Sequence, residues 1–192
     1  VSCEVIPNHL FLNTDDYVRL GARVQMNPPI RGPKNADSLW RGLKDGIIDF
    51  IATDHAPHTL EEKSRPYPDS PAGMPGVETS LPLMLTQFKA GKCTLKQVQN
   101  WMSVGPAMTY GIPNKGCIAE GFDADLALVD MDRRHPVRDE EMFSRAGWSP
   151  YTGLELTGWP VYTIVGGQVV FESGRIRPGV HGKPLTFRRP GT

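Results

Sequence analysis

An acid and two histidines follow directly on a short apolar run in this chain. The run is Phe50–Thr53, and Asp54, His55 and His58 come next. A carboxylate at the end of a buried strand can bind a divalent metal and can accept a proton from water. Amide hydrolysis needs both metal binding and proton transfer. The alternative is an ordinary strand followed by a polar loop, with Asp54 bracing that loop.

A second polar residue, Asn27, ends another short apolar stretch just before Pro28 and Pro29. Its carboxamide has both donors and an acceptor, which suits recognition of a ring amide or imide. A turn asparagine before two prolines is the alternative explanation. The Asp54–His58 spacing also fits a pair of metal ligands.

The surrounding pattern predicts a βαβ unit that would place these side chains at one edge of a parallel sheet. A strand over 24–26, a helix starting at Asn35–Ser38 and a strand over 47–53 follow one another within about 30 residues, as in such units. A long loop over 59–76 is expected to be functional. The other elements expected in this part are a strand over 1–6 and helices over 13–20, 77–90, from Thr94 onward, and 105–110.

The pattern changes to β-structure after residue 115. Residues 124–130 alternate like a strand, and 161–165 and 168–171 predict a hairpin around Gly166 and Gly167. We expect 131–160 to be irregular. The tail after Arg177 is interpreted as a surface strap or a mobile end.

Composition argues against several function classes. The chain has 21 basic and 21 acidic residues and no basic stripe, which gives no support for nucleic-acid binding. It has no apolar run of about 20 residues that would indicate a membrane helix. Cys3, Cys93 and Cys117 form no Cys-x-x-Cys pair, so we expect neither a disulfide framework nor a zinc ribbon, and a reduced, cytoplasmic setting.

Several short motifs together resemble one branch of a known family. They are Met26–Arg31, Thr53–His58 and Gly73–Thr79, joined by Cys3–Leu10 and Gly121–Leu126. The chain is similar to the carboxyl-terminal half of the bacterial-type dihydroorotases, in the metal-dependent amidohydrolase superfamily. The fold that this resemblance implies is α/β, with the last βα units of a (β/α)8 barrel over 1–115 and a small β module with the tail over 116–192.

The resemblance also assigns roles to residues. It makes Asp54 a metal ligand and the residue that moves the proton, and it makes Asn27 and His58 substrate contacts. Ala72 and Gly73 would touch the substrate through their backbone, where glycine lets a backbone approach closely.

Three further positions complete the comparison with the family. The resemblance places Glu4 close to the metal centre in some relatives, as a weaker metal candidate. The resemblance assigns no metal or substrate role to His55, which we expect to be structural or to support a neighbouring site residue. Asn8 departs from the family, which usually has a second histidine there.

The implied function is the zinc-dependent interconversion of N-carbamoyl-L-aspartate and L-dihydroorotate in pyrimidine synthesis, with one or two zinc ions. The family's His-x-His and its other main metal ligands do not occur in this chain, and Val1–Glu4 looks like the inside of a strand. We therefore expect a missing N-terminal barrel half, and neither tight zinc binding nor turnover by these 192 residues alone. Two alternatives remain: an allantoinase or hydantoinase, and a non-catalytic scaffold for a partner such as aspartate transcarbamoylase. A homo-oligomer is the other partner to consider.

Overall fold

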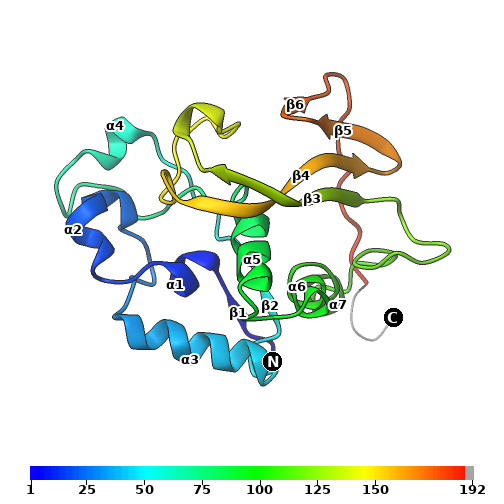
Figure 1. The fold of residues 1–192 in the computed structure, drawn as a ribbon, viewed down its shortest axis with the longest axis horizontal. Coiled ribbons are helices and arrows are strands. Elements are labelled where there is room, and N and C mark those ends of the chain that lie inside the picture. The colour runs from blue at the N-terminus through cyan, green and yellow to red at the C-terminus, as the bar shows by residue number, and fades with distance from the viewer. Residues whose placement is uncertain (189–192) are drawn as a thin grey trace.

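The computed structural model describes residues 1–188 and shows two sheets joined by helices (Figure 1). The first sheet is a parallel pair, β1 (Glu4–Val5) and β2 (Phe50–Ile51), in which Glu4 is level with Phe50 and Val5 with Ile51. The elements between them are α1 (Pro7–Phe11), α2 (Asp16–Leu20), the 3-10 turn η1 (Gly21–Val24) and α3 (Pro33–Lys44). The strands predicted over 1–6 and 47–53, the helix over 13–20 and the helix starting at Asn35–Ser38 are confirmed, although each element is shorter or shifted.

The strand predicted over 24–26 is wrong. Val24 ends the η1 turn, and the parallel partner of β2 is β1. The apolar side chains of Val24 and Met26 are buried at 0% and 3% exposure, as a strand would bury them. The carbonyl of Gln25, however, accepts hydrogen bonds from the Gly73 N–H and the Lys63 ammonium group. The apolar pattern therefore indicated burial correctly, but the backbone hydrogen bonds of this segment are made with a distant loop.

Helix α3 begins two residues earlier than its polar residues suggested. Pro33 occupies the first helical position, where its missing N–H costs nothing and its fixed φ suits a helix. Leu43 is buried at 2% exposure, whereas Ile47, beyond the helix end, is 71% exposed.

The helices after the long loop form a compact group. Within the loop lies α4 (Leu60–Lys63), which a capping box between Thr59 and Glu62 initiates. The helices that follow are α5 (Ser80–Lys89), α6 (Leu95–Gln99), the π turn η2 (Asn100–Val104) and α7 (Gly105–Thr109). The two separate helices expected after Thr94 therefore run on as one rod from Leu95 to Thr109. At Gly105 a Cβ atom would lie 2.8 Å from the Asp49 carbonyl oxygen, so glycine lets the rod touch the segment that leads into β2.

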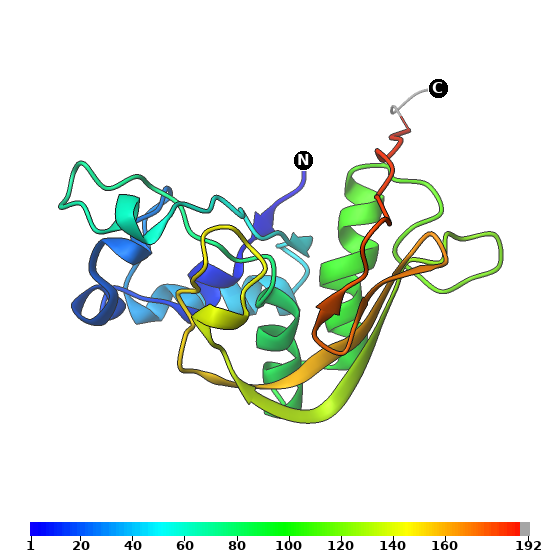
Figure 2. The ribbon, with the colours of Figure 1, turned by 90° about the horizontal axis from the view of Figure 1, so that it is seen from above.

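The second sheet is antiparallel, in the order β3-β4-β5-β6. Figure 2 shows β3 and β4 as a long curved ribbon beneath α5 and the α6–α7 rod. The strand bounds are β3 (Leu126–Pro136), β4 (Glu155–Val165), β5 (Gln168–Glu172) and β6 (Arg175–Ile176), with a 3-10 turn η3 (Asp139–Glu141) after β3. The hairpin at Gly166 and Gly167 is confirmed, and both glycines have the positive φ that a type I′ turn needs.

The irregular segment predicted over 131–160 is wrong at both ends. Strand β3 continues to Pro136 and β4 already begins at Glu155. Register shifts between Leu128 and Val129 and between Asp130 and Arg134 interrupt the ladder. These irregularities account for the weak alternation in the sequence, because a bulge breaks the period-2 pattern without ending the strand.

The hydrophobic core crosses the boundary proposed at residue 115. One cluster joins Ile6 and Met26 of the first part to Trp148, Tyr151 and Leu156 of the second. At Gly158 of β4 a Cβ atom would lie 2.8 Å from that of Leu85 on α5. The β module is therefore packed directly on the helices that carry the loop. Residues 1–188 contain no helix long and apolar enough to cross a membrane.

Candidate active site at the end of the parallel strands

Asp54 stands where the chain leaves the parallel pair. Phe50 and Ile51 are buried at 3% and 5% exposure, and the Ala52 N–H donates to the Val5 carbonyl at 3.0 Å. Two residues later Asp54 is exposed, with φ at 44°. A non-glycine residue in this left-handed region costs about 1–2 kcal/mol, and such strain persists only where the surroundings hold it. The structure thus presents an exposed carboxylate on a fixed backbone at the strand end.

His58 is held at both its ring and its backbone. Its Nε2 lies 3.2 Å from the Ala72 carbonyl oxygen, and its Nδ1 lies 3.7 Å from Oε2 of Glu62. The backbone N–H and hydroxyl of Thr59 hydrogen-bond the Glu62 carboxylate and lower the pKa of that group. The carbonyl of His58 accepts a 2.8 Å hydrogen bond from the indole Nε1 of Trp148. The imidazole therefore lies between an anionic carboxylate and the predicted substrate loop.

The loop backbone at Ala72 and Gly73 lies against the strand-end segment. The Gly73 N–H donates to the Gln25 carbonyl at 3.0 Å, and the Ala56 N–H donates to the Met74 carbonyl at 3.1 Å. Gly73 has φ at +132°, and a Cβ there would lie only 2.5 Å from the Ala56 carbonyl oxygen. Glycine is required at this position on both counts. The structure thus brings Ala72, Gly73 and His58 together.

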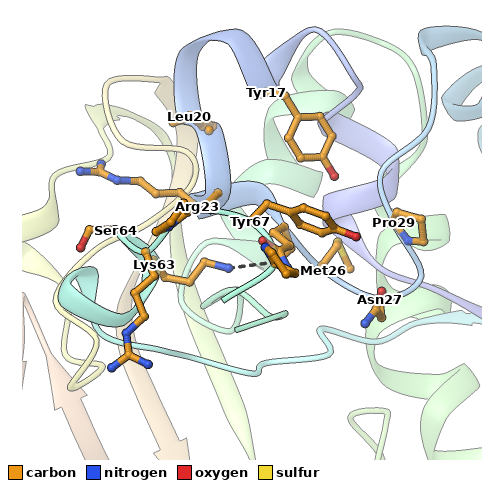
Figure 3. A pocket seen from close by; sticks show the side chains of 15 residues that line it. Tyr17, Leu20, Arg23, Met26, Asn27, Pro29, Lys63, Ser64 and Tyr67 are labelled. Atoms are coloured by element: carbon orange, nitrogen blue, oxygen red, sulfur yellow. Dashed lines mark hydrogen bonds between the residues drawn. The ribbon is translucent and has the colours of Figure 1, made fainter. Parts of the chain in front are cut away.

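Asn27 belongs to the segment that is hydrogen-bonded to this loop through Gln25. It is exposed, two residues beyond the Gln25 carbonyl that binds Gly73. Together with Tyr17, Lys63 and Tyr67 it lines a pocket of about 1100 Å³ (Figure 3). Asp54, His58, Ala72 and Gly73 do not line this pocket. Of the five predicted site residues, this pocket therefore contains Asn27 alone.

Lys63 is a buried residue that the sequence analysis missed. Only 2% of it is exposed, and its ammonium group donates to the carbonyls of Gln25, at 3.0 Å, and Pro71, at 2.7 Å (Figure 3 shows the first bond). Burial lowers the pKa of Lys63 to about 8. The signal available in the sequence was the Thr59–Glu62 capping box, which places Lys63 on the last turn of a short helix.

Glu4 and Asn8, near the start of the chain, form hydrogen bonds with two tyrosines. Glu4 is level with Phe50, four positions before Asp54, and its carboxylate accepts a 3.2 Å hydrogen bond from Tyr110. The charge of Glu4 raises the pKa of that phenol. Asn8 is 1% exposed and its Oδ1 accepts a 2.7 Å hydrogen bond from the buried Tyr151. The residue that departs from the family pattern is therefore part of the packed core.

The described residues do not fit a metal ion by themselves. Within 1–188, no group of three or more His, Cys, Asp or Glu side chains is arranged to hold one. A zinc site needs about three protein ligands, and the strand end supplies the carboxylate of Asp54.

Comparison with known proteins places the chain in a family. The profile of the Amidohydrolase family matches residues 11–170. The dihydroorotase of Bacillus licheniformis is 42% identical over 177 residues, covering 92% of this chain and 41% of that protein. The dihydroorotase of Geobacillus kaustophilus is 44% identical over 176 residues, again covering 41% of its length.

Solved structures of related enzymes share the fold. The L-hydantoinase (dihydropyrimidinase) of Arthrobacter aurescens superposes with a TM-score of 0.91 at 36% identity, over 97% of this chain and 43% of that one. A D-hydantoinase from Thermus sp. gives a TM-score of 0.83 at 27% identity. The chain thus spans about two fifths of the length of the relatives it matches, and its mixed α/β structure corresponds to part of theirs. Since the family profile covers most of the sequence, this chain belongs to the amidohydrolase family.

Proposed function

We propose that the complete protein is a dihydroorotase, which interconverts N-carbamoyl-L-aspartate and L-dihydroorotate in pyrimidine synthesis in the cytoplasm. The observation that carries the proposal is the 42–44% identity to dihydroorotases over more than nine tenths of this chain. Identity to the hydantoinase structures is lower, at 36% and 27%.

The site residues have proposed roles that agree with their geometry. Asp54, exposed on a fixed backbone, takes a proton from the attacking water and returns it to the leaving ring nitrogen. His58 and the Ala72–Gly73 backbone, which hydrogen bonds already hold together, bind the substrate. Asn27 binds the polar edge of the ring from the segment before Pro28. This arrangement leaves proton transfer and substrate orientation to different side chains.

Zinc, as one or two ions, is proposed for the complete protein only. Asp54 would supply one ligand, and the remaining ligands must come from outside these residues, because they form no complete site. Glu4 is the weaker metal candidate, since it is level with Phe50 and its carboxylate is engaged by Tyr110.

The arrangement of the whole protein is also a proposal. The parallel pair β1–β2 would belong to a (β/α)8 barrel, which typically needs about 250 residues, so an N-terminal barrel half is required. Residues 1–115 would be barrel units and 116–192 a β module and tail. A second copy of the chain or an aspartate transcarbamoylase is the proposed type of partner.

A hydantoinase-type enzyme is the second candidate. The observation that favours it is the superposition on L-hydantoinase, with a TM-score of 0.91 over 97% of this chain. Both candidates hydrolyse a ring amide, so the described site residues suit either reaction. An allantoinase activity is a further member of the same reaction class.

The test is hydrolysis of L-dihydroorotate, hydantoins, dihydrouracil and allantoin by the complete, metal-loaded protein. We expect the highest kcat/KM for dihydroorotate and loss of activity in Asp54→Asn. Asp37→Asn is the matched control, because Asp37 is an exposed acid on α3. A preference for hydantoins would support the second candidate. A folded protein without any of these activities would support the non-catalytic scaffold.

A further inference from the structure

His55 sits between the proposed proton carrier and the substrate loop, and its ring is used in an unusual way. Its Nδ1 accepts hydrogen bonds from two consecutive backbone groups, the Gly76 N–H at 3.1 Å and the Val77 N–H at 3.3 Å. Because an imidazole nitrogen accepts only when it carries no proton, the neutral ring must hold its proton on Nε2. The contacts therefore select one tautomer of His55.

The backbone around His55 is also hydrogen-bonded to the same loop. His55 and Met74 form a parallel β-bridge, and the next residue, Ala56, donates to the Met74 carbonyl at 3.1 Å. On the other side of Asp54, the carbonyl oxygen of Thr53 lies 3.3 Å from where a Cβ of Gly76 would be. Asp54 is thus flanked by two residues that both lie against the loop.

The two hydrogen bonds accepted by the His55 ring hold this loop at a second place, further along the chain than the bridge. The bridge at Met74 fixes the middle of the loop, and the ring nitrogen of His55 fixes the turn at Gly76 and Val77 just before α5. The substrate-binding backbone at Ala72 and Gly73 precedes these anchors directly. Its position relative to Asp54 depends on both of them.

We propose that His55 is a positioning residue, whose Nδ1 anchors the Gly76–Val77 turn and so holds the Ala72–Gly73 backbone in register with Asp54. It acts through the loop and takes no proton from the substrate. The inference rests on the proposed function for its kinetic consequence, whereas the anchor itself does not depend on the reaction.

The test compares His55→Leu with His55→Asn in the complete protein. Leucine has a similar shape but no acceptor, whereas the asparagine Oδ1 is bonded through Cγ, as the histidine Nδ1 is, and can accept the same N–H groups. His181→Leu is the matched control, since His181 is exposed in the tail. Amide hydrogen exchange at Gly76 and Val77 measures the anchor, and exchange in α5 checks that the fold is intact.

In His55→Leu we expect exchange at Gly76 and Val77 to accelerate about tenfold, the factor that corresponds to about 1.4 kcal/mol. We expect KM for dihydroorotate to rise by about the same factor while kcat changes less. The loop contributes equally to binding of the substrate and of the transition state, and that shared binding is what the variant loses. His55→Asn should recover most of both effects. A purely space-filling role would predict no rescue by asparagine.

Two results would overturn the proposal: wild-type exchange and KM in His55→Leu, or an asparagine variant no better than leucine. If the wild-type protein hydrolyses none of the ring substrates, the proposed function fails. The exchange comparison at Gly76 and Val77 still decides whether His55 anchors the loop.

Discussion

The buried ammonium group of Lys63 gives the most quantitative prediction. It donates to two carbonyls, and among residues 1–188 no carboxylate oxygen lies within 4.0 Å of it. Burial lowers the pKa of Lys63 from its usual 10.5 to about 8. The perturbation is Lys63→Met, which keeps an unbranched chain of similar length but removes the titrating group.

The sign of the effect follows from proton binding. Below about pH 8 both the folded and the unfolded states hold the proton, and the cost of burying the charge is fully present. Between about pH 8 and 10.5 the unfolded lysine still holds its proton while the folded one has released it, so stability rises with pH. The gap between the two pKa values corresponds to about 3 kcal/mol in total, of which about 2 kcal/mol falls between pH 7 and 9.5.

The assay is urea unfolding of the complete protein at about pH 7 and about pH 9.5. The free energy of unfolding of the wild type should rise by about 2 kcal/mol more than that of Lys63→Met over this interval. Groups that titrate in both proteins cancel in the difference. The two carbonyls that lose their donor destabilise the variant equally at both pH values. Lys34→Met, at an exposed position in α3, is the control and should follow the wild type. Parallel pH dependences of wild type and Lys63→Met would refute the reasoning.

Three other outcomes are expected. Gly73→Ala should lower the free energy of unfolding by at least about 2 kcal/mol in thermal melts, because its Cβ would lie 2.5 Å from the Ala56 carbonyl oxygen at φ +132°. Gly182→Ala, which has open space around it, should melt like the wild type. Trp148→Phe should cost about 1–3 kcal/mol in urea unfolding, since it leaves the His58 carbonyl without its 2.8 Å donor; an unchanged midpoint would contradict this. The 192 residues alone should retain no stoichiometric zinc after dialysis, as measured by atomic absorption, and tight binding would refute the incompleteness of the site.

Several parts of the site could be predicted because their causes are local. An apolar pair followed by a turn and an acid places Asp54 at the end of β2, whatever lies around it. Thr94 with Gln97 starts the predicted helix through side chains three residues apart, whereas the same pattern at Thr59 and Glu62 starts α4 inside a segment predicted to be a loop. The prediction failed at Val24–Met26, because apolar spacing reports burial and does not report which backbone groups form the hydrogen bonds.

The sequence by itself determined which chemical groups are available and where each stands on its own strand, loop or helix. Asp54, His55 and His58 follow β2 because the buried residues before them form a strand that must end there. Only the tertiary structure decided what meets these groups. The carbonyl of His58 binds an indole 90 positions away, and the ring of His55 binds a turn more than 20 positions away. Hydrogen bonds between such distant residues leave no periodic pattern in the chain, since their geometry exists only after the loop has packed against the strand end.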